Sequence, residues 1–279
     1  MSIQTVTTIL TDADQVTTQL VAATGFARAM DAHLHVLIIV SGMDQSGLMP
    51  SALEALPVGV GLEQNEAQVK EIEKLVTDHM SKEDIRWNVE TVTTPAASST
   101  AEIVQHTRFS DLVIQQRLPQ GEGHEQTRIL SETILFDADT PLLLLPAETS
   151  LVAPPSKIMI SWDESAAALR ATRQALPLLS DRAYVHVVLV DPPKDAPDRS
   201  DPGGAFAQFL SRHGIKCEVS VCNRTDNSIS ATLERRAAEL GCDMIVMGAY
   251  GHSRLRQAIF GGTTRDILMN AQAPIFMAH

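Results

Sequence analysis

Asp243-Met244-Ile245-Val246-Met247-Gly248-Ala249-Tyr250-Gly251 begins the stretch around which this 279-residue chain is organised, and the stretch ends at Gly261-Gly262-Thr263-Thr264. The apolar run up to Met247 is typical of a buried β-strand. A helical pattern follows, from Thr264 to Asn270. The sequence therefore predicts a strand, a loop punctuated by glycines and a helix, in that order.

This loop has the chemistry of a phosphate site. Glycines let backbone N–H groups approach a bound group closely, and a helix N-terminus adds unpaired donors and partial positive charge. Thr263 and Thr264 add hydroxyls, while Arg254 and two further arginines add charge nearby. The alternative is a flexible loop with a Gly-Gly helix cap, and glycine spacing does not by itself distinguish the two.

The chain repeats itself, which indicates a duplicated domain. Asp111-Leu112-Val113-Ile114 matches Asp243-Met244-Ile245-Val246, and we also align Thr8-Ile9-Leu10 with Lys157-Ile158-Met159. A segment rich in Ala, Pro and Ser, Ala147 to Ser156, reads as the linker. We therefore expect one domain over residues 1–148 and a second over residues 153–279.

Each half alternates apolar strands with helical patterns. The expected strands are Thr5–Leu10, His33–Val40, Trp87–Val92, Asp111–Ile114, Leu142–Leu145, Lys157–Ser161, Val185–Val190, Lys216–Val221, Asp243–Met247 and Ile275–Met277. The expected helices are Gln15–Met30, Glu63–Met80, Ser99–Thr107, Gln126–Phe136, Ala166–Leu179, Gly204–His213, Ser228–Leu240 and Thr264–Asn270. This alternation predicts an α/β fold of two tandem doubly wound domains, each a five-stranded parallel sheet with helices on both faces. Such sheets bind ligands beyond the carboxyl ends of their strands.

Composition and charge narrow the possible partners. Residues 1–150 hold 8 Lys and Arg against 21 Asp and Glu, a net charge of −13, whereas residues 151–279 hold 14 against 13, a net charge of +1. The acidic excess argues against nucleic acid, and a polyanion meets less repulsion in the second half. No apolar run is long enough to span a bilayer, and no signal peptide is recognised. Three cysteines without a C-x-x-C pair favour a reducing, cytoplasmic setting.

The pattern Gly248-x2-Gly251-x9-Gly261 resembles the nucleotide-binding signature of the ATP-binding universal stress proteins. In that family a Ser or Thr usually follows the last glycine, whereas here Gly262 intervenes before Thr263 and Thr264. Ser161-Trp162-Asp163 resembles the family's strand end that meets adenosine, although Trp162 replaces a small residue. The alternative role for Asp163 is to cap the N-terminus of the following helix, and Ser165 is the other candidate for that capping role.

The resemblance implies that the second half binds ATP, with Mg²⁺ or Mn²⁺ held largely by the phosphates, and that the chain has a regulatory role in the stress response. It places Leu189 against the base, and Trp162 either on the base or over the sheet. The implied nucleotide-binding residues are Ser161, Trp162, Asp163, Leu189, Met247, Gly248, Gly251, Arg254, Gly261, Gly262, Thr263 and Thr264. It also implies that the last strands of the two halves pair antiparallel in an internal pseudo-dimer, and a homodimer is a further possibility.

The first half lacks these features. Aligned to the second half, Gln116 and Pro119 replace Gly248 and Gly251, while Arg128 and Ile129 replace Gly261 and Gly262. The Cβ atom of each of these four residues keeps a phosphate from approaching the backbone closely. We therefore expect the nucleotide site of the first half to be degenerate.

Two other classes of function stay open. One is an interaction module that binds no nucleotide, because Gly262 stands where the family usually has Ser or Thr. The other is an adenine-nucleotide-dependent enzyme on a related fold, although Ser161 to Ser165 holds no glycine for a phosphate loop. No catalytic arrangement and no metal-ligand spacing stands out, so at most slow ATP hydrolysis is expected.

Overall fold

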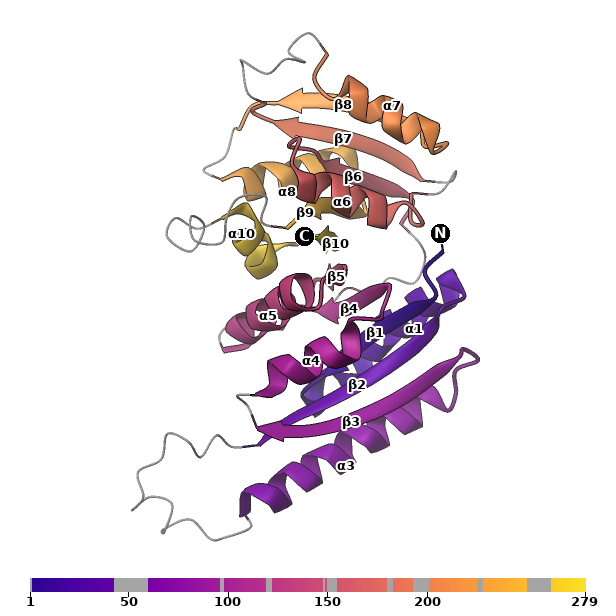
Figure 1. Cartoon of the computed structure of the whole chain (residues 1–279), viewed down its shortest axis with the longest axis vertical. Helices are drawn as coiled ribbons and strands as arrows, with labels where there is room; N and C mark the ends of the chain where they lie inside the picture. The colour runs from indigo at the N-terminus through magenta and orange to yellow at the C-terminus, as the bar shows by residue number, and fades with distance from the viewer. Residues whose placement is uncertain are drawn as a thin grey trace, which may run out of the picture.

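The structure is a computed structural model, and the residues it describes are 2–42, 60–95, 98–118, 122–147, 149, 155–179, 183–192, 201–224, 228–249 and 262–279. Within these residues ten strands form one sheet in the order β3-β2-β1-β4-β5-β10-β9-β6-β7-β8 (Figure 1). The strands are β1 (Thr5–Leu10), β2 (His33–Gly42), β3 (Trp87–Pro95), β4 (Leu112–Gln116), β5 (Leu142–Leu145), β6 (Lys157–Ser161), β7 (Tyr184–Val190), β8 (Cys217–Cys222), β9 (Met244–Gly248) and β10 (Ile275–Ala278).

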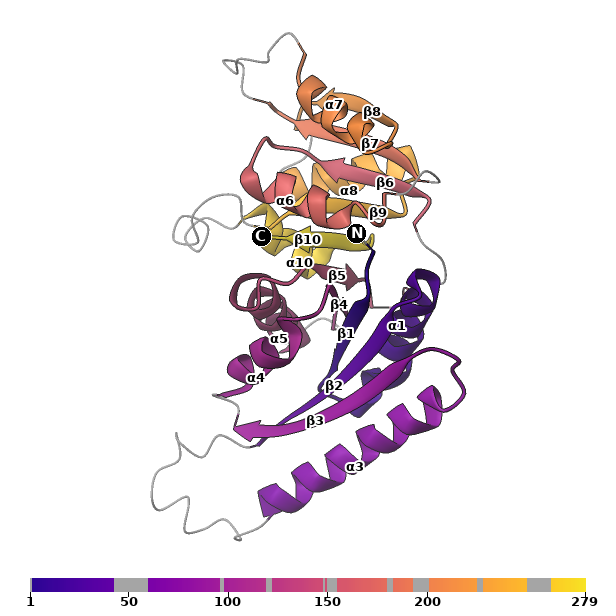
Figure 2. The same cartoon turned by 45° about the vertical axis from the view of Figure 1, so that its right-hand side comes forward.

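Helices cover both faces of each half, which confirms the doubly wound fold. They are α1 (Val16–Met30), α3 (Val60–Met80), α4 (Ser99–Thr107), α5 (Glu122–Glu132), α6 (Ala166–Ala175), α7 (Gly204–Arg212), α8 (Ile229–Leu240) and α10 (Thr263–Asn270). One hydrophobic cluster packs α1, α3, α6 and α7 on the sheet, and a second packs α4, α8 and α10 on the opposite face. Figure 2 shows α1 and α4 on opposite sides of the first-half sheet.

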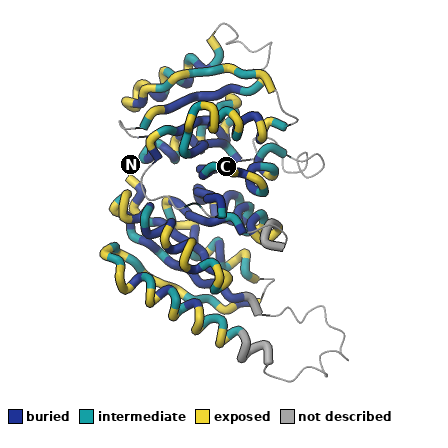
Figure 3. The backbone as a smooth tube through the Cα atoms, turned by 180° about the vertical axis from the view of Figure 1, so that it is seen from behind, coloured by how far each residue is buried: buried dark blue, intermediate teal, exposed yellow. Residues whose placement is uncertain are grey.

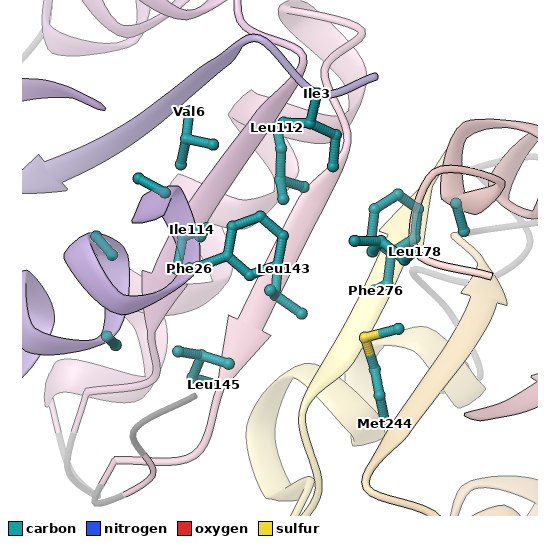
Figure 4. Packing of buried hydrophobic residues seen from close by; sticks show 14 of the residues in the cluster. Ile3, Val6, Phe26, Leu112, Ile114, Leu143, Leu145, Leu178, Met244 and Phe276 are labelled. Carbon is teal, nitrogen blue, oxygen red and sulfur yellow. The ribbon is translucent and has the colours of Figure 1, made fainter. Parts of the chain in front are cut away.

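The two halves join through their last strands. β5 and β10 pair antiparallel, with Leu143 opposite Phe276, whereas the other strand pairs are parallel. All residues of both strands are buried (Figure 3). Figure 4 shows Phe276 and Leu143 in the apolar cluster that continues from one half into the other. The predicted internal pairing is therefore confirmed, and it closes two sheet edges that would otherwise be open.

Arg117, which follows β4 in the first half, reaches into the second half. Its Nη1 donates to the carbonyl oxygen of Ala271 at 2.7 Å, and Ala271 is the C-terminal capping residue of α10. A cation is favourable there, because the carbonyl groups at a helix C-terminus carry partial negative charge. Burial lowers the pKa of Arg117, and the nearby Glu234 carboxylate of α8 opposes that shift. This contact joins the end of the first-half sheet to the helix that begins at Thr263.

The duplication is visible in equivalent hydrogen bonds. Asp111 accepts from the backbone N–H of Thr5 at 2.9 Å, and Asp243 accepts from that of Lys157 at 3.1 Å. The strand registers agree, since Val6 pairs with Leu112 and Ile158 pairs with Met244. Thr5 is therefore the equivalent of Lys157, and the alignment of Thr8 with Lys157 is wrong by three residues. Two short apolar runs contain no polar marker that would fix their register.

Two mostly buried imidazoles make the stability of the fold dependent on pH. Burial lowers the pKa of His35 in β2 and of His186 in β7, and the neighbouring Glu90 and Glu218 carboxylates oppose the shift only partly. Both histidines therefore bind protons less readily in the folded chain than in the unfolded chain.

The free energy of unfolding should therefore fall as the pH drops below the unfolded histidine pKa of about 6.5, and should level off below the folded pKa values. Urea unfolding at pH 7.5 and pH 5.5 measures this change. In a chain carrying both His35→Gln and His186→Gln the change over that range should be smaller, and an unchanged difference would contradict the assignment.

Candidate functional site

A hollow lies at the carboxyl ends of β6, β7 and β9 in the second half. Its volume among the described residues is about 170 Å³. It is lined by Ser161, Trp162, Asp163, Val190, Ile229, Leu233, Met247, Gly248, Thr263 and Thr264. The structure therefore brings together seven of the residues predicted from sequence. Gly251, Arg254 and Gly261 lie outside the described residues, and Gly262 adjoins the hollow as the capping residue before α10.

One end of the hollow is the start of α10. Its capping residue is Gly262, which has extended backbone (φ −114°, ψ 154°) and makes no side-chain capping bond. The N–H groups of the first helical turn carry the positive end of the helix dipole. Thr263 and Thr264 place hydroxyl-bearing side chains beside these donors. This end of the hollow suits a negatively charged oxygen.

The hollow is also lined by the strand end that carries Asp163. Its Oδ1 accepts from the backbone N–H of Ser165 at 3.1 Å, and the side chain is exposed. Ser165, not Asp163, caps α6, because its Oγ accepts from the N–H of Ala168 at 3.0 Å. The capping role therefore belongs to Ser165, and the exposed Asp163 side chain is among the residues that line the hollow.

Gly248 is required by packing. A Cβ at this position would lie 2.4 Å from the backbone nitrogen of Ala168 and 2.6 Å from the carbonyl carbon of Ala167. The end of β9 therefore contacts the first turn of α6 directly, and no side chain fits between them. The sequence interpretation took this glycine for close approach to a ligand. The structure shows close approach to a helix, and Gly248 also lines the hollow.

Trp162 covers the sheet. Its ring stacks on that of Phe206 in α7, with centroids 3.9 Å apart and an angle of 8° between the planes. Trp162 also packs against the apolar cluster on that face. One face of the indole is thus occupied by protein, which agrees with the second of the two roles considered for this residue.

The apolar side of the hollow differs from the prediction. Leu189 is 1% exposed and packs in the core on the α6 and α7 face of the sheet. Successive residues of a strand point to opposite faces, so the next residue, Val190, lines the hollow in its place. Ile229 and Leu233 of α8 complete this apolar wall. Sequence reasoning chose Leu189 rather than its neighbour Val190 for the base. It missed Ile229 and Leu233, although their spacing is that of one helix face.

The first half is built differently at the equivalent position. Gln116 stands where Gly248 stands in the second half, and its backbone N–H donates to Oε1 of Gln19 in α1 at 2.8 Å. The side chain of Gln116 donates to the carbonyl of Thr149 at 3.2 Å. Arg128 is held by Glu125 and Glu132 of its own helix, which raise its pKa.

Within the ranges described above, no group of three or more His, Cys, Asp or Glu side chains could hold a metal ion. The helices of that part of the chain include none long and apolar enough to cross a membrane. The lining of the hollow likewise includes no Lys or Arg from these ranges.

Comparison with known proteins identifies the relatives of this arrangement. The model of the universal stress protein family matches residues 155–279. A universal stress protein of Synechocystis sp. is 26% identical over 147 residues, which cover 52% of this chain and 48% of that protein. The chain therefore spans about half the length of the curated relative that it matches.

Solved structures extend the likeness of the fold to the whole chain. A universal stress protein from Archaeoglobus fulgidus is similar with a TM-score of 0.67 and 14% identity, covering 98% of this chain and 95% of that one. A functionally unknown protein from Pseudomonas aeruginosa is similar with a TM-score of 0.62 and 16% identity, covering 99% and 92%. At these identities the likeness concerns the fold, a mainly parallel sheet of two five-strand halves.

Proposed function

We propose that this chain, a member of the universal stress protein family through residues 155–279, binds one ATP in the hollow at the carboxyl edge of its second half. The start of α10 carries the proposal, because the positive end of this helix lies at a hollow that two of its threonines line. With ATP bound there, the protein acts as a nucleotide-dependent regulator of the stress response.

The lining of the hollow suits the parts of an adenine nucleotide. Val190, Ile229 and Leu233 form an apolar wall for the base. Asp163 and Ser161 offer oxygens to the ribose hydroxyls. The phosphates lie at the N-terminus of α10, where Thr263 and Thr264 donate hydroxyl hydrogens and Gly251, Arg254 and Gly261 complete the site. Mg²⁺ or Mn²⁺ bound together with the nucleotide would neutralise part of the charge on the phosphates.

Hydrolysis of this ATP is slow at most. A general base must lie within hydrogen-bond reach of the attacking water. Among the described lining residues Asp163 is the one carboxylate, and its Oδ1 already accepts a hydrogen bond from the backbone N–H of Ser165. We therefore propose that nucleotide occupancy, rather than turnover, is the signal.

The first half takes no ATP in this proposal. Gln116 brings a side chain to the position of Gly248, and Arg128 is already paired with two glutamates. Residues 1–150 also carry a net charge of −13. Steric exclusion and electrostatic repulsion act together against a triphosphate.

Equilibrium dialysis of the full chain at saturating ATP and Mg²⁺ should give one bound nucleotide per chain. Two bound nucleotides, or one that persists when residues 151–279 are deleted, would overturn the proposal. Mass spectrometry of ligand released from the purified protein separates the other classes of function. Retention of an adenine nucleotide supports the proposal, whereas a transformed second substrate would indicate an enzyme.

The Asp163→Ala chain should bind ATP about tenfold more weakly, because one hydrogen bond to a charged group is worth about 1.5 kcal/mol or more. The matched control is Asp12→Ala. Asp12 lies at the equivalent edge of the first half, and its Oδ1 accepts from the N–H of Asp14 at 3.1 Å in the same local geometry. Titration calorimetry should show normal ATP affinity for the control, and equal affinities for the two variants would remove Asp163 from the site.

A further inference from the structure

A second cavity of the second half lies on the α6 and α7 face of the sheet. Its volume is about 360 Å³, in the range of pockets that hold small organic ligands. We call it the aromatic pocket, and its described lining is Trp162, Glu164, Leu169, Arg173, Gly203, Ala205, Phe206 and Phe209. Aromatic residues make up 4% of the chain but three of these eight positions. This enrichment distinguishes the pocket from an ordinary gap between two helices.

The aromatic wall of the pocket is anchored in the core. The ring of Phe206 stacks on Trp162, and its centroid lies 6.0 Å from that of Phe209 with 21° between the planes. Phe206 is 4% exposed, whereas Trp162 and Phe209 are only partly buried. Aromatic rings favour offset-stacked and edge-to-face contacts with further rings. The exposed parts of Trp162 and Phe209 therefore suit a planar aromatic group.

The fold itself does not require this wall. The strand registers of the two halves make Leu10 the first-half equivalent of Trp162. Leu10 is 1% exposed and lies in the same hydrophobic cluster, so a leucine completes the packing at this position. The helix that covers this face also differs, since α3 has 21 residues and α7 has 9. The second half thus presents aromatic surface beyond what its packing needs.

Arg173 supplies the pocket with a positive charge. Its guanidinium carbon lies 5.9 Å from the ring centroid of Phe209, a cation–π contact, and the residue is exposed. In the described part of the chain no carboxylate forms an ion pair with Arg173. A guanidinium that lies over a ring keeps the N–H groups at its edge free, in a fork that matches a carboxylate. The pocket therefore offers a carboxylate site beside aromatic surface.

Glu164 determines the direction in which an anionic ligand lies. It directly precedes Ser165, the capping residue of α6, and the helix rises roughly 12 Å from Ser165 to Arg173 at about 1.5 Å a residue. Both charged residues are exposed, and this backbone separation exceeds the Debye length of about 8 Å at physiological ionic strength. Glu164 therefore repels an anion at its own end of the pocket but only weakly at Arg173.

We propose that the aromatic pocket binds an aromatic carboxylate, with its ring against Phe209 and Trp162 and its carboxylate on Arg173. This inference does not rest on the proposed ATP site, because the described lining of the hollow includes neither Arg173 nor the two phenylalanines. Trp162 lines both cavities, so its indole reports on a ligand in the aromatic pocket even when no nucleotide is present.

Titration of phenylacetate into the nucleotide-free full chain, followed by tryptophan fluorescence, tests this inference. The chain has two tryptophans, so Trp87→Phe leaves Trp162 as the reporter. Its emission should change saturably, and Arg173→Gln should weaken binding by about tenfold or more, because charge-assisted hydrogen bonds are lost. Arg212→Gln is the matched control and should bind like the parent. Arg212 is exposed on α7, bonds to Gln208 and lies outside the described lining of the pocket.

Two further probes separate charge from ring. Phenylacetamide has the shape of phenylacetate without its charge and should bind about tenfold more weakly or worse. Acetate has the charge without the ring and should not displace phenylacetate. All variants should unfold thermally like the Trp87→Phe chain, since both arginines are exposed.

The inference is overturned if phenylacetate produces neither a saturable fluorescence change nor a heat of binding. It is also overturned if Arg173→Gln leaves the affinity unchanged, which would place the ligand in the hollow or elsewhere. Equal affinities for phenylacetate and phenylacetamide would exclude the carboxylate contact. A separate titration with ATP and Mg²⁺ reports on the proposed function, and either result there leaves the outcome for the aromatic pocket as it is.

Discussion

Gly248→Ala should destabilise the second half by about 3 kcal/mol or more, because overpacking a tight contact typically costs about 1–3 kcal/mol and this contact is to backbone. The added methyl group would lie 2.4 Å from the nitrogen of Ala168 and 2.9 Å from Cβ of Ala167. A backbone cannot rotate away as a flexible side chain can, so β9 and α6 must separate. Urea unfolding measures the loss, and the thermal midpoint should fall by on the order of 10 °C.

Gly262→Ala is the control for this substitution. Gly262 has a φ of −114°, an extended conformation that alanine adopts without strain. The control should unfold like the parent, whatever it does to ATP binding. A Gly248→Ala chain as stable as the parent would show that the contact between β9 and α6 is looser than the structure has it. Weak ATP binding by Gly248→Ala should accordingly be attributed to altered packing, not to a lost ligand contact.

Thr263→Glu should reduce the affinity for ATP by roughly 100-fold or more while leaving the fold intact. Thr263 is the first residue of α10 and lines the hollow. A carboxylate there stabilises the helix by about 0.3–1 kcal/mol through the helix dipole. The same carboxylate repels the phosphates, and two like charges about 4 Å apart cost about 4 kcal/mol near a protein surface. Stability and affinity should therefore change in opposite directions.

Thr263→Gln separates charge from size, since Gln and Glu have the same length. Its affinity for ATP should fall by about tenfold or less, because one hydroxyl contact is lost without repulsion. Calorimetric titration of both variants, with thermal unfolding of each, provides the comparison. Parent-like affinity in Thr263→Glu would mean that the phosphates do not lie at the start of α10.

The fold was predictable because its signals are local and repeated. Apolar strands alternate with helical patterns in both halves, and the strands found in the structure lie within a few residues of the expected ones. The helix expected over Ala166–Leu179 ends at Ala175, and the chain then continues in a turn. The pairing of Leu142–Leu145 with Ile275–Met277 was also predictable, since both runs are apolar and end their halves.

The site was predictable only in part, and the reasons are physical. The positions of Asp163 and Thr263 follow from strand and helix ends, which polar and glycine residues mark. Which of Leu189 and Val190 faces the hollow depends on a register that differs by one residue, and an apolar strand contains no marker for it. The packing role of Gly248 depends on a helix 80 residues earlier in the chain, and no local pattern contains that contact.

The handedness of the sheet determines where the two carboxyl edges lie. β5 and β10 run in opposite directions at the centre, and adjacent strands of a sheet rotate by roughly 20–25°. Across the ten-stranded order from β3 to β8, this rotation accumulates to roughly half a turn. The arrowheads of β2, β3, β7 and β8 accordingly point to the same side in Figure 1. At the outer strands both carboxyl edges therefore face one side of the molecule, so both are reached from the same direction.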